Sequence, residues 1–129
     1  MNRVFSNNAN PNSRNDFLGD ELKKYGKKAT VKIAVAFFTD HQFIKTLVDN
    51  GCSVQLIVRL RPPTSAYSLN KILHLKDVYI RYYTANEFHP KLYIFGYKIA
   101  FIGSSNLTNS GLVSNQELNI SAQTADMNL

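Results

Sequence analysis

The sequence lacks most features that would stabilise or anchor a protein by means other than a hydrophobic core. Cys52 is the only cysteine among the 129 residues, so the chain cannot form an internal disulfide bond. No apolar run approaches the roughly 20 residues that a membrane-spanning helix needs. Residues 1–16 are rich in Asn and Ser and have no apolar segment of the kind found in secretory signals. Together these absences predict a cytoplasmic protein with no membrane span.

Motifs for metals and nucleotide cofactors are also missing. His41 and His74 have no further ligand residues at the spacing of a zinc site. No glycine pattern of the P-loop or dinucleotide-binding type occurs. Cys52 lies between Gly51 and an apolar run, a position more typical of a core residue than of a nucleophile. The sequence therefore predicts neither a bound metal nor a cofactor.

Acidic residues are scarce in most of the chain. Residues 1–98 contain all 15 Lys and Arg but seven of the nine Asp and Glu, a net charge of +8, whereas residues 99–129 carry −2. A basic body favours a polyanionic partner, with nucleic acid first and an anionic membrane surface second. A charge that serves solubility alone is the alternative.

Apolar periodicity and turn residues predict one α/β domain. Residues 1–14 are expected to be a flexible arm, and residues 15–129 the folded domain. Helices are predicted at 16–25, 40–50 and 65–75, and strands at 30–38, 53–60, 78–83, 91–95, 98–102 and 116–122. The early strands are joined by helices and should be parallel, whereas two later strands form an antiparallel hairpin. We therefore expect a mixed β-sheet flanked by helices on both faces.

Four polar residues are predicted to meet at two neighbouring strand ends. His89 and Lys91 are two residues apart, so their side chains point to the same face of a strand. Ser104 lies at the exit of the hairpin partner, and Asn106 follows in the next loop. An imidazole, an ammonium, a hydroxyl and an amide suit a tetrahedral phosphate. The set therefore predicts phosphodiester chemistry, although each residue alone has an alternative role in a loop, turn or exposed strand.

Each member of this set has a chemical role in that prediction. A neutral His89 can attack phosphorus and form a covalent phosphohistidine. Lys91 and Asn106 would stabilise the charge on the equatorial oxygens, and Ser104 would donate a further hydrogen bond. The second ring nitrogen of His89 needs an acceptor to fix its tautomer, and Glu117 is the candidate.

The same residues resemble the signature of the phospholipase D superfamily, which is His-x-Lys, four residues, Asp, six residues and Gly-Ser-x-Asn. His89-Pro-Lys91 and Gly103-Ser-Ser-Asn106 stand at that spacing, and the resemblance spans most of residues 30–122. One position departs from the pattern, because Gly96 replaces the Asp. It falls in the predicted hairpin turn, where glycine can form the turn itself.

The resemblance implies phosphodiester cleavage through a phosphohistidine, without a metal, in a phospholipase D-like fold. The reaction needs two histidines, one that attacks and one that protonates the leaving oxygen. Long members carry the signature twice, whereas this chain carries it once. Short members with one signature, bacterial nucleases among them, act as homodimers with the site on the two-fold axis. We therefore expect a homodimer in which each subunit supplies His89, Lys91, Ser104, Asn106 and Glu117.

The chain also resembles the nuclease domains of phospholipase D-type restriction enzymes, so a DNA endonuclease is the first functional prediction. This likeness leaves open an additional DNA-recognition domain outside residues 1–129. A phospholipase or phosphatidyltransferase, and a non-catalytic module that binds phosphate or nucleic acid, are the alternatives. Four cations are candidates for a phosphate track, namely Arg59, Arg61, Lys71 and Arg81. Three tyrosines are candidates for stacking on unpaired bases, namely Tyr67, Tyr82 and Tyr83.

Overall fold

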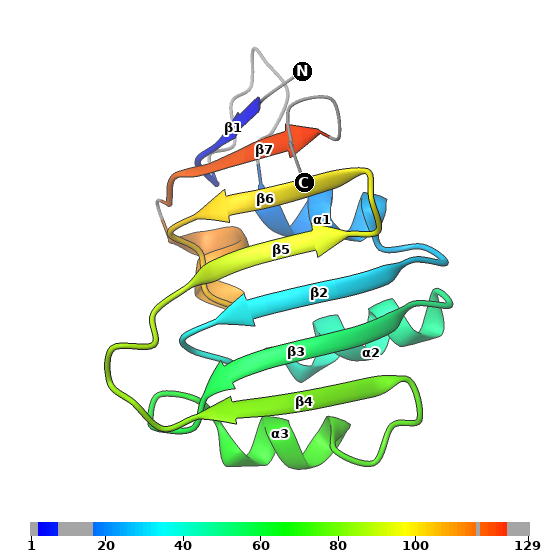
Figure 1. Ribbon diagram of the computed structural model, residues 1–129. Helices are drawn as coiled ribbons and strands as arrows, with labels where there is room; N and C mark the ends of the chain where they lie inside the picture. Colours follow the sequence, from blue (N-terminus) through cyan, green and yellow to red (C-terminus); the bar gives the residue numbers. More distant parts are fainter. Residues whose placement is uncertain (1–2, 8–16, 116, 124–129) are drawn as a thin grey trace.

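The computed structural model describes residues 3–7, 17–115 and 117–123. Seven strands form one sheet in the order β1-β7-β6-β5-β2-β3-β4 (Figure 1). The strands are β1 (Arg3–Phe5), β2 (Thr30–Val35), β3 (Ser53–Arg59), β4 (Val78–Tyr83), β5 (Lys91–Phe95), β6 (Ile99–Gly103) and β7 (Asn119–Gln123). The helices are α1 (Leu18–Tyr25), α2 (His41–Asp49) and α3 (Ala66–Ile72), followed by a π-helical turn, η1 (Ser110–Ser114).

The sheet is mixed, as the sequence predicts. Strands β2, β3 and β4 are parallel and are joined through α2 and α3, whereas β5, β6, β7 and β1 pair antiparallel. Local caps begin the two crossover helices: the Asp40 carboxylate accepts from Phe43 N at 3.0 Å, and Ser65 Oγ accepts from Ser68 N at 3.1 Å. The predicted α/β class and mixed sheet are confirmed.

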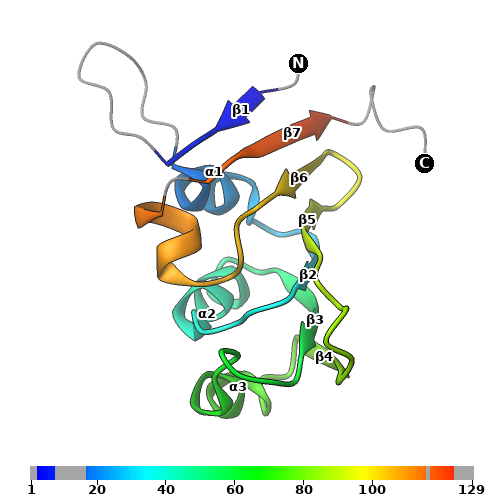
Figure 2. The same ribbon diagram turned by 90° about the vertical axis from the view of Figure 1, so that its left-hand side faces the viewer.

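The arrangement of the helices differs in one respect from the expectation. In the described part of the chain, α1, α2, α3 and η1 all lie on the same face of the sheet (Figure 2). The reason is topological, because β2, β3 and β4 follow one another in a single direction across the sheet. Two right-handed crossovers that advance in the same direction place both helices on the same face, and only a reversal of direction would move one across.

The two faces of the sheet carry different side chains. On the covered face, Val31, Ile33 and Val35 of β2 are buried beneath the helices. On the open face, one row of aligned residues crosses all seven strands, and six of its seven members are apolar. The row is Val4, Ile120, Ile102, Leu92, Ala34, Ile57 and Arg81. The sheet is therefore amphipathic only in part, since its open face retains an apolar stripe.

Strand β1 was not predicted, because residues 1–14 were expected to be an arm. Its residues pair with β7, and Arg3 also forms a salt bridge with Glu21 at 2.9 Å. Phe5 is buried, and its ring centroid lies 5.7 Å from that of Phe101. Burial of Phe5 and pairing with the edge of β7 thus order a segment whose composition is typical of a flexible arm. Residues 1–2 and 8–14 of the predicted arm, and the start of the helix predicted from residue 16, lie outside the described residues.

No helix in the described ranges is long and apolar enough to cross a membrane.

Candidate active site

The predicted site residues lie at one edge of the sheet, where several strands end. Because β2, β3 and β4 are parallel, their carboxyl ends meet at this edge, on the left of Figure 1. Antiparallel pairing brings the start of β5 and the end of β6 to the same edge. The structure therefore brings together the five residues predicted for catalysis, namely His89, Lys91, Ser104, Asn106 and Glu117.

His89 is exposed immediately before β5, and its ring meets that of Phe37 edge-on with centroids 5.9 Å apart. The neighbouring Lys91 ammonium lowers the pKa of His89, and desolvation and the Arg59 guanidinium lower it further. The lowered pKa therefore favours the neutral imidazole. This is the form that can attack phosphorus.

Lys91 lies beside His89, with its Nζ 3.2 Å from the His89 carbonyl oxygen, to which it donates. Partial burial lowers the pKa of Lys91, the nearby Glu117 carboxylate raises it, and Arg59 lowers it. The Lys91 side chain is partly buried, so its charge is less screened than that of a fully exposed lysine. It is well placed to neutralise an anion that approaches the imidazole.

Asn106 is held so that its amide donors remain available. Its Oδ1 accepts from the backbone N–H of Phe37 at 3.0 Å, which fixes the orientation of the amide. In the described part of the chain, Nδ2 has no hydrogen-bond partner. A Cβ at Gly111 would collide with the Asn106 carbonyl oxygen, so glycine is needed where the following turn packs against this residue. The loop therefore presents two N–H donors in a defined direction.

Ser104 and Glu117 are paired with each other. Ser104 Oγ donates to Glu117 Oε2 and accepts from Leu118 N at 2.9 Å. Asn115 Nδ2 donates to the second carboxylate oxygen at 3.4 Å. The structure thus places Glu117 on Ser104 rather than on the ring of His89, and the hydroxyl proton of Ser104 points to the carboxylate. The Glu117 carboxylate also interacts electrostatically with Lys91, whose pKa it raises.

A buried support beneath this loop was not predicted from the sequence. Ser105 is fully buried, and Asn119 is 2% exposed. Asn119 Nδ2 donates to Ser105 Oγ at 2.7 Å, and Tyr93 Oη donates to the Ser105 carbonyl oxygen at 2.9 Å. The available signal was an asparagine inside an otherwise strand-like segment, since a buried amide requires hydrogen-bond partners. These contacts fix the chain at Ser105, between Ser104 and Asn106.

Gly96, which stands where the family signature has Asp, lies in the β5–β6 turn at the opposite end of β5. Its φ is +57°, and a Cβ there would meet nothing within 4 Å. The position therefore satisfies the turn with a left-handed glycine. It contributes no group to the edge that contains His89.

The four candidate cations of the phosphate track do not lie together. Arg59 stacks over Phe37 with its Cζ 4.8 Å from the ring centroid, and Arg61 also lies at the site edge after β3. Lys71 lies on α3, where its ammonium is 5.1 Å from the Tyr67 centroid. Arg81 lies on the open face of the sheet, opposite to α3. Only Arg59 and Arg61 are close to the predicted catalytic residues.

Comparisons with known proteins agree with this geometry. The family described as cardiolipin synthase, PLD-like domain, matches residues 23–128. The sequence has no significant match among curated proteins.

Solved structures with the same fold include proteins of different lengths. NucT from Helicobacter pylori has a TM-score of 0.71 at 21% identity, covering 94% of this chain and 84% of that one. Nuc from Salmonella typhimurium, a phospholipase D family member, has a TM-score of 0.67 at 16% identity, covering 94% and 81%. Yeast tyrosyl-DNA phosphodiesterase has a TM-score of 0.59 at 13% identity, covering 95% and 32%. At these identities, the likeness to the solved structures establishes the fold.

Proposed function

The chain belongs to the phospholipase D superfamily as a PLD-like domain, and we propose that it is a metal-independent DNA endonuclease. Members of this superfamily cleave phosphodiesters. The finer assignment rests on which groups the site presents and on the charge of the chain.

The observation that carries the proposal is that His89 lies beside the Lys91 ammonium and contacts Phe37, whose backbone holds the amide of Asn106. Lys91 both lowers the pKa of His89 and supplies a positive charge for the phosphate. Phe37 joins the two sides of the site, because its ring contacts His89 and its N–H holds the Oδ1 of Asn106. A diester that binds at these groups would contact the nucleophile and also the groups that stabilise the charge of the transition state.

The proposed reaction has two steps. A ring nitrogen of His89 forms a bond to phosphorus while the bond from phosphorus to the leaving oxygen breaks, and an imidazolium donates a proton to that oxygen. Water then attacks the phosphohistidine, releases the phosphate monoester and returns a proton to the second imidazole. The bound anion raises the pKa of the histidine that must act as acid, because opposite charges favour the protonated form.

The second histidine is proposed to be His89 of a second copy of the chain. The remaining histidines of the sequence are His41 and His74. His41 lies at the start of α2, where its Nδ1 is 3.1 Å from Ser68 Oγ, and His74 follows α3. Neither lies at the end of β6 or the start of β5. A symmetric dimer supplies the acid without any further residue type.

Two observations favour DNA over phospholipid as the proposed substrate. Residues 1–98 carry a net charge of +8, which attracts a polyanion. The fold is also that of yeast tyrosyl-DNA phosphodiesterase, whose name records a DNA phosphodiester. The family description, cardiolipin synthase, favours phospholipid as the second candidate. A module that binds phosphate or nucleic acid without turnover is the third.

The first test is cleavage of plasmid and single-stranded DNA in excess EDTA by the wild type and by His89→Ala. Metal-free cleavage that disappears in the variant supports the proposal. An acid-labile phosphate adduct on His89, seen by intact mass spectrometry in rapidly quenched samples, identifies the intermediate. Turnover of phosphatidylglycerol vesicles without DNA cleavage would instead support the lipid enzyme, and binding without turnover the third candidate.

The shared site has its own test, in which inactive His89→Ala protein is added to a fixed amount of wild type. If each site needs both histidines, an equal amount of variant lowers the activity to about half after subunit exchange, because mixed dimers are inactive. A self-sufficient monomer keeps its full activity. Sedimentation velocity at the assay concentration gives the oligomeric state directly.

A further inference from the structure

A partly exposed pair of stacked aromatic rings lies beside the predicted nucleophile. The rings of Tyr83 and Phe88 have centroids 4.5 Å apart and planes only 8° from parallel. Tyr83 ends β4 and is 50% exposed, and Phe88 immediately precedes His89. Since consecutive Cα atoms are about 3.8 Å apart, the aromatic pair and the imidazole belong to the same small region of surface.

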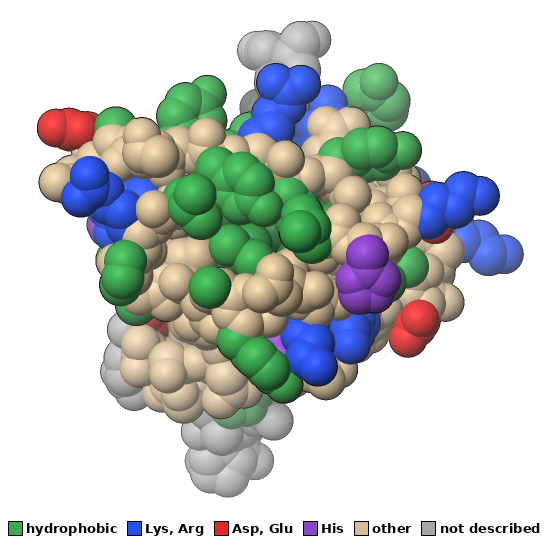
Figure 3. Space-filling model, turned by 90° about the horizontal axis from the view of Figure 1, so that it is seen from below, with side chains coloured by type: hydrophobic (Ala, Val, Ile, Leu, Met, Phe, Trp, Pro, Cys, Tyr) green, Lys and Arg blue, Asp and Glu red, His purple; other side chains and the backbone are tan. Residues whose placement is uncertain are grey.

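Two further tyrosines of β4 are also exposed. Figure 3 views the molecule from the side of β4 and α3, where hydrophobic side chains gather on the surface. Tyr79 and Tyr82, on the same strand as Tyr83, are 61% and 41% exposed. Within the described part of the chain, Tyr83 differs from both because its ring is stacked on another ring and lies at the site edge.

The loop that joins the two stacked residues is fastened to the sheet by two arginines. Arg59 Nη1 donates to the Asn86 carbonyl oxygen at 2.8 Å, and Arg61 Nε donates to the Thr84 carbonyl oxygen at 2.8 Å. The plane of the aromatic pair is thus set before any ligand arrives, which reduces the ordering cost of binding. The same contacts place two guanidinium charges beside the rings.

A flat aromatic face, fixed cations and a diester-cleaving site together match one chemical class of ligand. Nucleobases have planar faces that stack on aromatic side chains, and each base is linked to the next through a phosphodiester. A phospholipid head group offers the phosphate but no planar ring. In duplex DNA the base faces are already covered by their neighbours, so only an unpaired base is free to extend the stack.

We propose that Tyr83 and Phe88 form a stacking platform for an unpaired base next to the phosphate held at His89, so that the preferred substrate is single-stranded nucleic acid. This inference rests on the proposed function, which supplies the cleaved diester. The inference adds that the substrate is single-stranded rather than double-stranded, and it names the residues that select for this. The competing explanation is that the two rings only stabilise the loop that carries His89.

The test compares binding of two oligomers of equal length, one of single-stranded thymidine and one made of abasic nucleotides. Fluorescence anisotropy measures the dissociation constants of the wild type, Tyr83→Leu and Phe88→Leu, all in a His89→Ala background that prevents cleavage. Each leucine keeps apolar bulk but removes a π face. We expect each variant to bind the thymidine oligomer about tenfold more weakly than the parent, with unchanged affinity for the abasic oligomer.

Matched controls separate recognition from loop stability. Tyr97→Leu removes a tyrosine that is 88% exposed in the turn at the opposite end of β5, and it should leave both affinities unchanged. Phe88→Trp retains a planar ring and should preserve the preference for the base-bearing oligomer. Glu87→Gln removes the acid of the loop and should tighten both oligomers equally, because it acts on the backbone charge.

The outcomes divide cleanly. Equal losses on both oligomers, or no loss on either, would overturn the platform and leave the rings as loop supports. Binding of anionic vesicles that falls with the same leucine variants would also overturn it. Because the readout is binding, the two proposals can fail separately. A base-dependent loss in these variants, together with a wild type that cleaves no DNA, would refute the proposed nuclease activity while supporting the recognition surface.

Discussion

Both ends of the central strands are basic, but their cations are held in different ways. At the site end, Arg59, Arg61 and Lys91 each donate to a backbone carbonyl oxygen of residues 84–89. Two of these partners lie in the loop before His89, and the third is the His89 carbonyl itself. The cations at this end therefore also fix the backbone that carries the imidazole.

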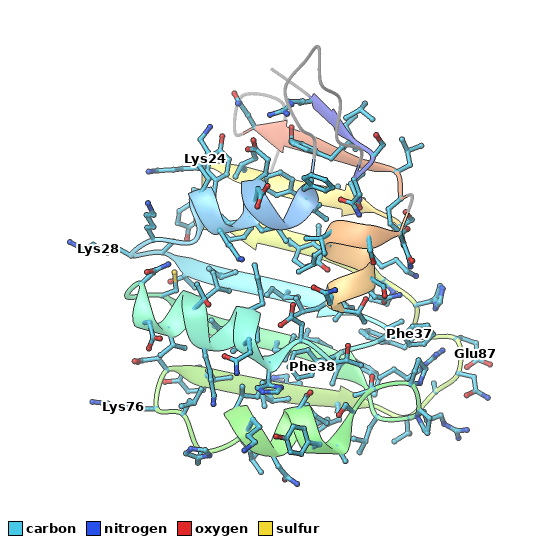
Figure 4. All side chains as sticks on the ribbon, turned by 180° about the vertical axis from the view of Figure 1, so that it is seen from behind. Lys24, Lys28, Phe37, Phe38, Lys76 and Glu87 are labelled. Atoms are coloured by element: carbon cyan, nitrogen blue, oxygen red, sulfur yellow. The ribbon has the colours of Figure 1, made fainter. Side chains whose placement is uncertain are left out.

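At the opposite end, lysines surround an open hollow of about 820 Å³. Figure 4 shows Lys24 and Lys28 at this end, away from Phe37 and Glu87. Among the described residues, no acid lines the hollow. The lysines that line it are Lys24, Lys27, Lys28, Lys32 and Lys98.

The difference shows how one kind of charge serves two purposes. A guanidinium or ammonium that is hydrogen-bonded to a carbonyl oxygen is fixed, so it can orient a single phosphate. Lysines on flexible stems act as point charges whose attraction for a polyanion is screened by salt. We therefore expect cation substitutions at the site end to change turnover, and lysine substitutions at the opposite end to change affinity and its salt dependence.

The largest effect is expected for His89→Ala. Loss of the nucleophile should lower DNA cleavage at least about 10³-fold, because the remaining groups stabilise charge but cannot form the covalent intermediate. The free energy of unfolding should change by less than about 0.5 kcal/mol, since the ring is exposed. His74→Ala is the matched control and should retain full activity.

Asn106→Asp should lower cleavage by about 10²- to 10³-fold. The carboxylate can still accept from Phe37 N, so the loop keeps its anchor, but the two Nδ2 donors are lost and a negative charge faces the phosphate. Single-turnover kinetics with saturating DNA measures the chemical step. Near wild-type turnover would show that the amide does not contact the phosphate.

Two glycine substitutions contrast the ends of the hairpin at similar cost in stability. A methyl at Gly103 would collide with the Leu118 carbonyl oxygen, so Gly103→Ala should displace Ser104 and cost about 1–3 kcal/mol. Gly96→Ala meets no atom but is strained by its φ of +57°, at about 1–2 kcal/mol. Urea unfolding gives both values. We expect activity to fall sharply only for Gly103→Ala, and equal activities would contradict the contrast.

The pKa of His89 should rise in Lys91→Met. The wild-type ammonium disfavours the protonated imidazole, so its removal lets the ring take up a proton at higher pH. NMR titration of the three histidines reports this without requiring activity, and the His89→Ala spectrum assigns the signal. In the wild type, the lowered pKa keeps the nucleophile neutral to lower pH than a free histidine. Lys98→Met, at the lysine end, should leave the pKa of His89 unchanged.

The smallest effect is expected at the lysine end. Lys24→Gln combined with Lys27→Gln should weaken binding of single-stranded DNA about threefold at 50 mM salt and less at 200 mM, with unchanged single-turnover rate. Lys45→Gln combined with Lys76→Gln removes the same charge from lysines that do not line the hollow and is the control. A turnover defect in the first pair would show that the two ends are not separable.

Much of the fold could be predicted because it depends on local patterns. Alternating apolar residues in β2 and β3 and the capping residue Asp40 determine strands and a helix over short distances. The placement of His89 and Lys91 on one face of a strand follows from the two-residue period alone. The sequence also determined the chemical types at the site edge, since the hairpin of β5 and β6 is itself local.

The remaining features depend on contacts between residues far apart in the chain. Pairing of β1 with β7, the bond from Phe37 N to Asn106, and the clamp of Asn119 on Ser105 each need the completed sheet. The same holds for Glu117, which the sequence assigned to His89 and the structure places on Ser104. Sequence spacing constrains neighbours along a strand, whereas which loop meets which side chain is decided by strand order, crossover direction and the packing of buried polar groups.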